Sequence, residues 1–489
     1  MLSILHISDL HRSPADPISN EELLSALLRD RDRYLKEDPQ VPAPQAIVVS
    51  GDIIQGVPLR TEAFGRKVSE QYDVAEKFLS DLTTSFVNGD RSRVIIVPGN
   101  HDIDWNTARQ AMTLVGIEDA PAELEKALFK EDSIYRWNWK TRELYRVVDE
   151  VVYARRFSSY RDFFQRFYAG VEGLLRVSRD SDANLFELYD GRVVIAAFNS
   201  CSGNDCFAFH GSIPRSLIAQ TDLDIGRLGR AFELRISVWH HSIEGPPYRT
   251  DYMDVDIVRG MIGRGFRLGL YGHQHKAQAA PHQIYLPDRE TMGVVSAGSL
   301  CAGASELPPG VNRQYSIIEI SDDLQNARVH VREMQATNLF GRGTLNAWGG
   351  NSFATLSWEP SRDAGGRVID VGKERRRSIV DSAERVFKAK NYGEVIRLLR
   401  SDLENHGGYG RQLLLRSAHE LKKWELIIEI TESPQSIDEL VQRIEAFAAI
   451  GRFDDARAAL DHFGSQVGMP AATDRDIRAR LAAEEKMRK

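Results

Sequence analysis

Five short apolar stretches recur along the first 275 residues, and polar residues follow each of them. They span residues 4–7, 47–49, 94–97, 236–239 and 268–271, and they read ILHI, IVV, VIIV, ISVW and LGLY. Stretches this short, rich in β-branched or aromatic residues and bounded by glycine or polar residues, are typical of strands buried on both faces. We therefore predict five buried strands in an α/β domain.

The residues that follow these strands are of metal-binding type. The candidates are Asp9, His11, Asp52, Asn100, His240, His273 and His275. Side chains alternate along a strand, so residues i and i+2 share a face, as Asp9 and His11 would. Sites in open α/β sheets gather at the carboxyl ends of strands. Three of the candidate groups directly follow a glycine, where the backbone must turn sharply or approach a metal closely: Gly51, Gly99 and Gly272.

The order D-x-H, G-D, G-N-H-D, H and G-H-x-H is similar to that of the calcineurin-like metallophosphoesterase superfamily, over about residues 1–335. The resemblance implies a four-layer αββα sandwich that holds two divalent metal ions. By motif position, one ion would be held by Asp9, His11, Asp52 and His275. The other would be held by Asp52, Asn100, His240 and His273, with Asp52 bridging the pair. His101 would face the leaving group.

This resemblance implies a phosphoesterase that uses a bridging hydroxide. Two metal ions about 3.5–4 Å apart clamp the attacking and leaving oxygens of an in-line displacement. Proton donation by His101 to the leaving oxygen would contribute roughly 10²–10⁴-fold. Mixed His, Asp and Asn ligation suits Mn²⁺, which we expect here, and also Fe or Zn²⁺, better than Ca²⁺ or Mg²⁺.

Two adjacent histidines follow the fourth strand, and only one of them can lie on its inward face. The resemblance favours His240 as the ligand. His241 is then expected behind the ligands or in contact with the substrate. Many relatives carry proline two residues after the ligand, whereas this chain has Ser242.

A long insertion, predicted to be helical, separates GNHD from the next strand and covers about residues 104–179. Its second half is dense in aromatic residues and arginines, and several aromatics fall at helical spacing: Phe157, Tyr160, Phe164, Phe167 and Tyr168. One interpretation is the buried face of a helix packed on the sandwich. The other is a lid whose aromatics stack on bases and whose arginines, such as Arg155 and Arg156, bind substrate phosphates.

Three regions are expected along the chain: a catalytic domain over 1–340, a linker over 341–372 with one short strand, and a helical domain over 373–489. The last contains three related phrases whose aromatic residues Tyr392, Trp424 and Phe453 recur about every 30 residues, similar to tetratricopeptide hairpins. Such repeats often bind a protein, so a protein partner or self-association is expected. An ordinary helical bundle is the alternative.

Composition limits the partners and the cellular compartment that we expect for the protein. The net charge of −7 gives no global basic footprint for nucleic acid. No stretch approaches the roughly 18 apolar residues of a membrane span, and the N-terminus does not resemble a signal peptide. Three cysteines without a zinc-type spacing suggest reduced thiols in a cytoplasmic protein.

The substrate is less defined than the metal centre. The Ser/Thr phosphatase branch of the resembled family usually has Asp-Arg-Gly after its GD motif, whereas this chain reads GDIIQG. The segments GDIIQG and SDLHRS resemble instead the bacterial cyclic-nucleotide phosphodiesterase and repair-nuclease branches of that family, so the resemblance implies hydrolysis of phosphodiesters in nucleotides or nucleic acid. The alternatives are a phosphomonoesterase of the same fold, and a scaffold or sensor with a vestigial metal site and a protein-binding helical tail.

Overall fold

The computed structural model describes residues 1–128, 130, 133–243, 251–284, 290–303, 306–308, 310–344, 350–358, 383–384, 386–387, 390–400 and 407–488. The chain divides into two units, Met1–Arg362 and Asp363–Lys489, which are described separately. None of the described helices is long and apolar enough to cross a membrane.

One sheet of the first unit carries three of the predicted strands. In spatial order it runs β15 (Phe340–Arg342), β14 (Asn326–Met334), β13 (Gln314–Ile320), β1 (Leu2–Ile7), β2 (Ala46–Ser50) and β3 (Val94–Val97), and β16 (Phe353–Ser357) also pairs with β14. β1, β2 and β3 are parallel, with His6 opposite Val48 and Val48 opposite Ile95. Their carboxyl ends therefore meet at one edge.

The second sheet carries the other two predicted strands. Its order is β11 (Ala277–Ile284), β12 (Glu290–Ala297), β10 (Phe266–Tyr271), β9 (Leu234–Val238), β8 (Val193–Phe198) and β7 (Ala183–Leu188). β8, β9, β10 and β12 are parallel, and the strands at both edges are antiparallel to their neighbours.

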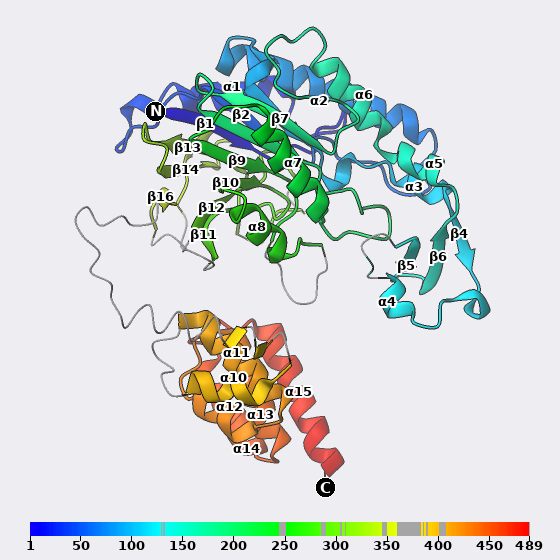
Figure 1. Ribbon diagram of the computed structural model, residues 1–489, viewed down its shortest axis with the longest axis vertical. Helices are drawn as coiled ribbons and strands as arrows, with labels where there is room; N and C mark the ends of the chain where they lie inside the picture. Colours follow the sequence, from blue (N-terminus) through cyan, green and yellow to red (C-terminus); the bar gives the residue numbers. More distant parts are fainter. Residues whose placement is uncertain are drawn as a thin grey trace. The chain divides into compact units, whose positions relative to one another are not determined.

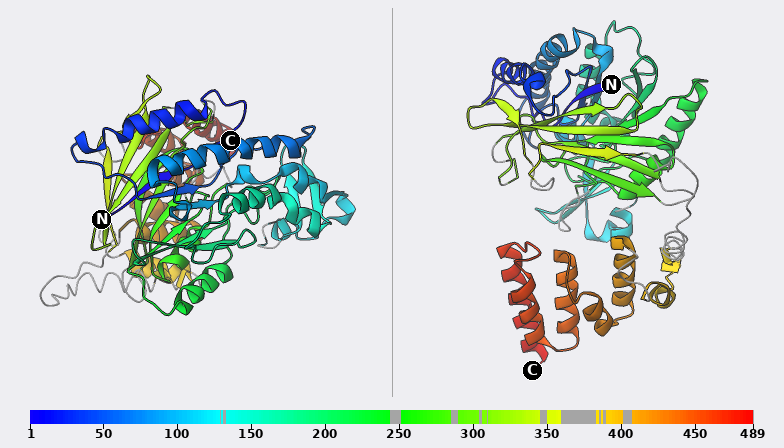
Figure 2. Two further views of the ribbon diagram at one scale, coloured as in Figure 1. Left: turned by 90° about the horizontal axis from the view of Figure 1, so that it is seen from above. Right: turned by 90° about the vertical axis from the view of Figure 1, so that its left-hand side faces the viewer.

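The two sheets stack face to face between helices (Figures 1 and 2). The two faces of β8 lie in different cores. Ile195 belongs to the core shared by both sheets, whereas Phe198 belongs to the core formed with the outer helices. α1 (Asn20–Arg31) and α2 (Phe64–Val87) cover the first sheet, and α7 (Arg215–Arg227) and α8 (Val255–Ile262) cover the second. The predicted αββα sandwich is confirmed.

The insertion is not purely helical, so this part of the prediction was wrong. It contains α3 (Trp105–Gln110), α4 (Leu124–Leu128), α5 (Glu150–Ala154) and α6 (Ser158–Phe167). It also forms a three-stranded antiparallel sheet of β4 (Met112–Val115), β6 (Glu143–Val147) and β5 (Tyr135–Asn138). The runs YRWNW and ELYRV alternate with a period of two around a short turn, which favours a β-hairpin over a helix.

The aromatic stripe at helical spacing belongs to α6 and its flanks. Tyr160, Phe164, Phe167 and Tyr168 are buried in the core shared with both sheets, and Phe157 is buried nearby. The buried-helix interpretation is therefore right for this stripe. These aromatics are inaccessible to a substrate.

Part of the predicted linker lies in the first unit. β16 pairs with β14 along its whole length, and the Trp358 indole N–H donates to the Leu324 carbonyl at 2.8 Å. The one short strand expected in this segment is thus β16, which completes the first sheet. Residues 345–349 and 359–382, which include the rest of the predicted linker and the start of the predicted helical domain, lie outside the described residues.

The second unit is helical in its described parts, as predicted. Its helices are α10 (Tyr392–Leu399), α11 (Gly407–Glu420), α12 (Trp424–Ile430), α13 (Ile437–Ala449), α14 (Phe453–Phe463) and α15 (Ala471–Arg488). The three recurring aromatic residues each lie two positions after a residue with left-handed backbone angles. Tyr392 follows Lys390, Trp424 follows Lys422 and Phe453 follows Gly451. In all three turns two backbone hydrogen bonds close a Schellman motif, for example Lys422 N–H to His419 O and Lys423 N–H to Ala418 O.

Candidate metal centre

The predicted ligands lie beyond their strands rather than on them. β1 ends at Ile7 and β10 at Tyr271, so the expected alternation along a strand does not explain why Asp9 and His11, or His273 and His275, converge. These four residues adopt left-handed backbone angles instead, with φ values of 51°, 45°, 76° and 54°. Asp52 does the same at 51°. The pairs converge because tight loops turn them toward one point.

Neighbouring loops hold this unusual backbone in place. The Asp9 N–H donates to the Gly51 carbonyl and the His11 N–H to the Asp52 carbonyl, both at 3.0 Å. A side chain at Gly99 would place its Cβ 2.1 Å from Asp52 Oδ1. Gly51, at a φ of +97°, similarly leaves room for the His240 ring. These two glycines therefore make space for ligand side chains.

Four of the candidates form a first cluster: Asp9, His11, Asp52 and His275. His275 Nε2 lies 3.3 Å from Asp9 Oδ1 and 3.2 Å from His11 Nε2. His11 Nε2 lies 3.8 Å from Asp52 Oδ2. Asp9, His11 and Asp52 are buried, so these donors face one another away from bulk water.

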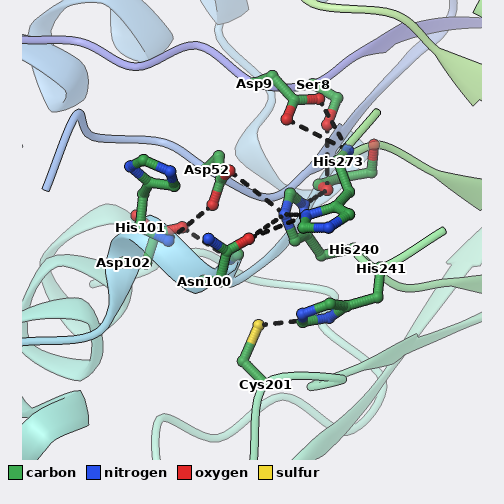
Figure 3. Close-up of polar contacts among 12 residues, drawn as sticks. Ser8, Asp9, Asp52, Asn100, His101, Asp102, Cys201, His240, His241 and His273 are labelled. Atoms are coloured by element: carbon green, nitrogen blue, oxygen red, sulfur yellow. Dashed lines mark hydrogen bonds and ion pairs between the residues drawn. The ribbon is translucent and has the colours of Figure 1, made fainter. Parts of the chain in front are cut away.

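A second cluster shares Asp52 with the first and adds His240 and His273. His240 Nε2 lies 3.3 Å from Asp52 Oδ2. Asn100 Oδ1 lies 3.1 Å from His240 Nε2 and 3.0 Å from His273 Nδ1, so the amide oxygen joins the same group (Figure 3). All seven predicted ligands thus come together in two groups, and Asp52 is the residue common to both.

The donor atoms fit two divalent cations. His240 Nδ1 lies 2.8 Å from the Ser50 carbonyl and His275 Nδ1 lies 2.9 Å from the Glu306 carbonyl, so each Nδ1–H has an acceptor. In the neutral rings, each Nε2 then presents a lone pair toward the centre, which is the arrangement that metal-binding histidines require. Imidazole, carboxylate and amide donors together suit Mn²⁺, Fe or Zn²⁺.

The buried carboxylates attract positive charge to this centre. Burial raises the pKa of Asp52, but His240 and the other nearby histidines outweigh it, so the pKa lies well below its usual value. Conversely, burial lowers the pKa of His240, while Asp52 and Asp9 oppose this effect and raise the pKa to about 9. The same balance with Asp9 raises the pKa of His275 to about 9. Such a site favours cations.

His101 borders the centre in a fixed orientation. Its backbone N–H donates to Asp52 Oδ1 at 2.8 Å, and its Nδ1 lies 2.7 Å from the Gln55 carbonyl. The Gln55 amide in turn donates to Glu306 Oε1 at 2.8 Å. Because the Glu306 carbonyl also accepts from His275, the Gln55–Glu306 contact joins the loop that orients His101 to the loop that orients His275.

Two residues that support the ligands, Asp102 and Ser200, were not predicted from the sequence. Asp102 accepts hydrogen bonds from the backbone N–H groups of Gly99, Ile53 and Ile54, and so ties the two ligand loops together. Ser200 Oγ accepts from the backbone N–H groups of both adjacent histidines at 3.1 and 3.2 Å. Asp102 lies inside the recognised GNHD motif, which was a signal for it. Nothing in the sequence singled out Ser200.

Two of the three predicted substrate contacts, His241 and Arg156, are buried. His241 is fully buried, with Nδ1 2.9 Å from Ser200 Oγ and its ring 4.9 Å from that of His273, so it lies behind a ligand rather than at a surface. Arg156 is also buried and donates to the carbonyls of Tyr153, Asn204 and Ser202. Its guanidinium therefore holds a loop instead of a phosphate. Arg155 is exposed.

Comparison with curated protein sequences gave no significant match. Among solved structures, the chain is similar to the calcineurin-like phosphoesterase YfkN from Bacillus subtilis, at 12% identity and a TM-score of 0.27, covering 75% of this chain and 92% of that one. A 5′-nucleotidase from Candida albicans matches at 11% identity and a TM-score of 0.36, covering 69% of this chain and 52% of that one.

A Staphylococcus aureus protein assigned as a 5′-nucleotidase matches at 11% identity and a TM-score of 0.29, covering 77% of this chain. This chain spans 58% of the length of that protein. The model of the calcineurin-like phosphoesterase family matches residues 2–277, which include all seven candidate ligands and His101. The chain therefore belongs to the calcineurin-like phosphoesterase family.

Proposed function

We propose that the protein is a phosphodiesterase that acts on nucleotides or nucleic acid with two divalent metal ions, most favourably Mn²⁺. One observation carries the proposal: seven donor residues form two groups around the shared Asp52 carboxylate. When bound, two such cations polarise phosphoryl oxygens and lower the pKa of a water molecule. Asp9, His11, Asp52 and His275 would hold one cation, and Asp52, Asn100, His240 and His273 the other.

His101 would act on the leaving group. Its Nδ1 is engaged by the Gln55 carbonyl, which leaves Nε2 to carry a proton toward the departing oxygen. The His101 ring lies 4.6 Å from the His11 ring, so it stands at the edge of the first ligand group. A proton donor at this position would offset the charge that develops as the ester bond breaks.

The choice of a diester over a monoester is supported by the contacts of the seven ligands, as far as the described residues show them. A monoester dianion carries a second negative charge that arginines bind well. Within the described residues, the hydrogen bonds and ion pairs of the seven ligands involve no lysine or arginine. Arg12 follows His11 but is itself buried and engaged by Asp16 at 2.8 Å and by Asn20. A diester, with a single negative charge, matches this site better.

The test is metal analysis combined with a substrate panel. We expect two metal ions per chain and Mn²⁺-dependent hydrolysis of an aryl phosphodiester, abolished by chelation and restored by Mn²⁺. Turnover of an aryl monoester should be much slower. A faster monoester reaction would overturn the diester assignment, and two bound metals without turnover of any substrate would favour a scaffold or sensor.

We also propose that the second unit is a helical-repeat module. Three Schellman turns of the same backbone geometry, followed by Tyr392, Trp424 and Phe453, support this assignment. Such modules bury their faces by stacking and present extended surfaces to other proteins. A protein partner or self-association through α10–α15 would be detected by comparing the mass of the full chain in solution with that of a monomer.

A further inference from the structure

The small sheet of the insertion carries aromatic residues at every second position of one strand. Tyr135 and Trp137 lie on β5, and Trp139 follows directly after the strand ends at Asn138. Residues two apart on a strand share a face, so Tyr135 and Trp137 line one side of the sheet. The rings of Trp137 and Trp139 lie 6.2 Å apart, and Trp139 is 71% exposed.

Positive charge accompanies these rings. Arg146 on β6 lies directly opposite Tyr135 in the antiparallel ladder, so it shares the aromatic face, and it is exposed. Lys140 and Arg142, in the turn between β5 and β6, are exposed as well. The only carboxylate within residues 133–148 is Glu143, which accepts hydrogen bonds from Thr141 and Tyr145. The hairpin of residues 133–148 therefore carries three exposed cations, Lys140, Arg142 and Arg146, and one carboxylate.

The opposite face of the sheet is anchored near the metal centre. Met112, Tyr145 and Val147 pack there in a cluster that includes Trp105, whose ring lies 6.3 Å from that of His101. Arg136, also on this face, is paired with the buried Asp205 and donates to the Tyr153 hydroxyl at 2.9 Å. The aromatic face is thus fixed relative to His101, with the sheet and the Trp105 cluster between them.

We propose that this face, formed by Tyr135, Trp137, Trp139, Lys140, Arg142 and Arg146, binds single-stranded nucleic acid. Exposed aromatic rings stack on unpaired bases, and adjacent cations bind the backbone phosphates. The proposal deepens the proposed function by naming its substrate class. A ligand that contacts both this face and His101 must pass around the sheet, which a polynucleotide does and a cyclic nucleotide does not.

Binding and catalysis can be separated in the test. Binding of a labelled single-stranded oligonucleotide of about 15 nucleotides to the full chain is measured by anisotropy with the metals chelated. Trp139→Ala should weaken binding about tenfold or more, as expected for the loss of one stacked base. Arg146→Ala should reduce the salt dependence of log K by about 0.7, the contribution of one single-strand phosphate contact.

The matched control is Leu223→Ala, which removes an exposed apolar side chain from α7, and it should bind as the wild type does. All three variants should hydrolyse the aryl phosphodiester at the wild-type rate. Wild-type affinity in both Trp139→Ala and Arg146→Ala would overturn the proposal, as would binding to phosphatidylserine vesicles in place of oligonucleotide. If these variants lose oligonucleotide binding while the wild type shows no diesterase activity, only the proposed function is refuted.

Discussion

The metal centre and the second unit use the same uncommon backbone conformation for different purposes. In the helical unit, the exposed residues Lys390 and Lys422 adopt left-handed angles simply to end a helix, and Gly451 does so at the third such turn. In the metal centre, five residues with side chains adopt these angles, and three of them are buried. A left-handed residue other than glycine costs about 1–2 kcal/mol.

Backbone strain is required only where the side chain itself is needed. At the helix ends glycine would serve better than lysine, because the side chain is not needed. At the centre glycine cannot replace Asp9, His11, Asp52, His273 or His275, because each side chain is a proposed ligand. The strain is therefore held by the surrounding hydrogen bonds and close packing, as is common at functional sites.

The largest expected effect separates the chemistry of Asp52 from its backbone. Asn tolerates left-handed angles and has the shape of Asp, so Asp52→Asn should keep the fold but remove the shared negative charge. Hydrolysis of an aryl diester should fall by at least about 10³-fold, and bound metal should drop below two per chain. A fully active Asp52→Asn enzyme with two metals would contradict the assignment of Asp52 as the bridging ligand.

The second prediction concerns the packing that holds the strained loop. In Gly99→Ala the new Cβ would lie 2.1 Å from Asp52 Oδ1 and 2.2 Å from its backbone nitrogen, so Asp52 must move. A displacement of about 1 Å typically costs about 10²-fold in rate. The control is Gly65→Ala on α2, where no atom lies within 4 Å. This variant should retain full activity and an unfolding free energy no lower than that of the wild type. If Gly99→Ala is as active as Gly65→Ala, the close packing at Gly99 does not position Asp52.

The third prediction concerns the contact between the two histidine-orienting loops. Glu306→Ala removes the acceptor of the Gln55 amide, so kcat should fall about tenfold, within the range of one hydrogen bond to a charged group. KM should change little, because the contact orients His101 and His275 rather than the substrate. Glu306→Gln retains an oxygen acceptor and should restore most of the rate. If Glu306→Gln is as slow as Glu306→Ala, the negative charge matters and the positioning role is wrong.

The smallest effect lies in the helical unit. Lys422→Gly should raise the unfolding free energy of this unit by about 0.5–1 kcal/mol, because the relief of left-handed strain exceeds the entropy cost of glycine. Gly451→Ala should lower it by about 1 kcal/mol. Urea unfolding followed by local hydrogen exchange in α11–α14 would measure both. If Lys422→Gly lowers the unfolding free energy, the lysine side chain stabilises the turn by more than its left-handed backbone destabilises it.

The sequence pattern was enough to predict the five apolar strands and the residues that meet at the centre, and the resemblance to a known family implied the αββα architecture. Buried strands can be predicted because they must be continuously apolar, and the ligand residues follow them in a recognisable order. The buried face of α6 was also predictable, because its aromatic residues recur at helical spacing.

The convergence of the ligands and the accessibility of each aromatic residue depend on the tertiary structure. The left-handed angles at Asp9 and His11 depend on carbonyl groups of the neighbouring loop, more than 40 residues away, which no local pattern encodes. Likewise, Arg156 and Trp139 belong to one aromatic and arginine-rich segment, yet the first is buried against backbone carbonyls and the second is exposed. Burial depends on contacts between distant segments, and composition cannot report those.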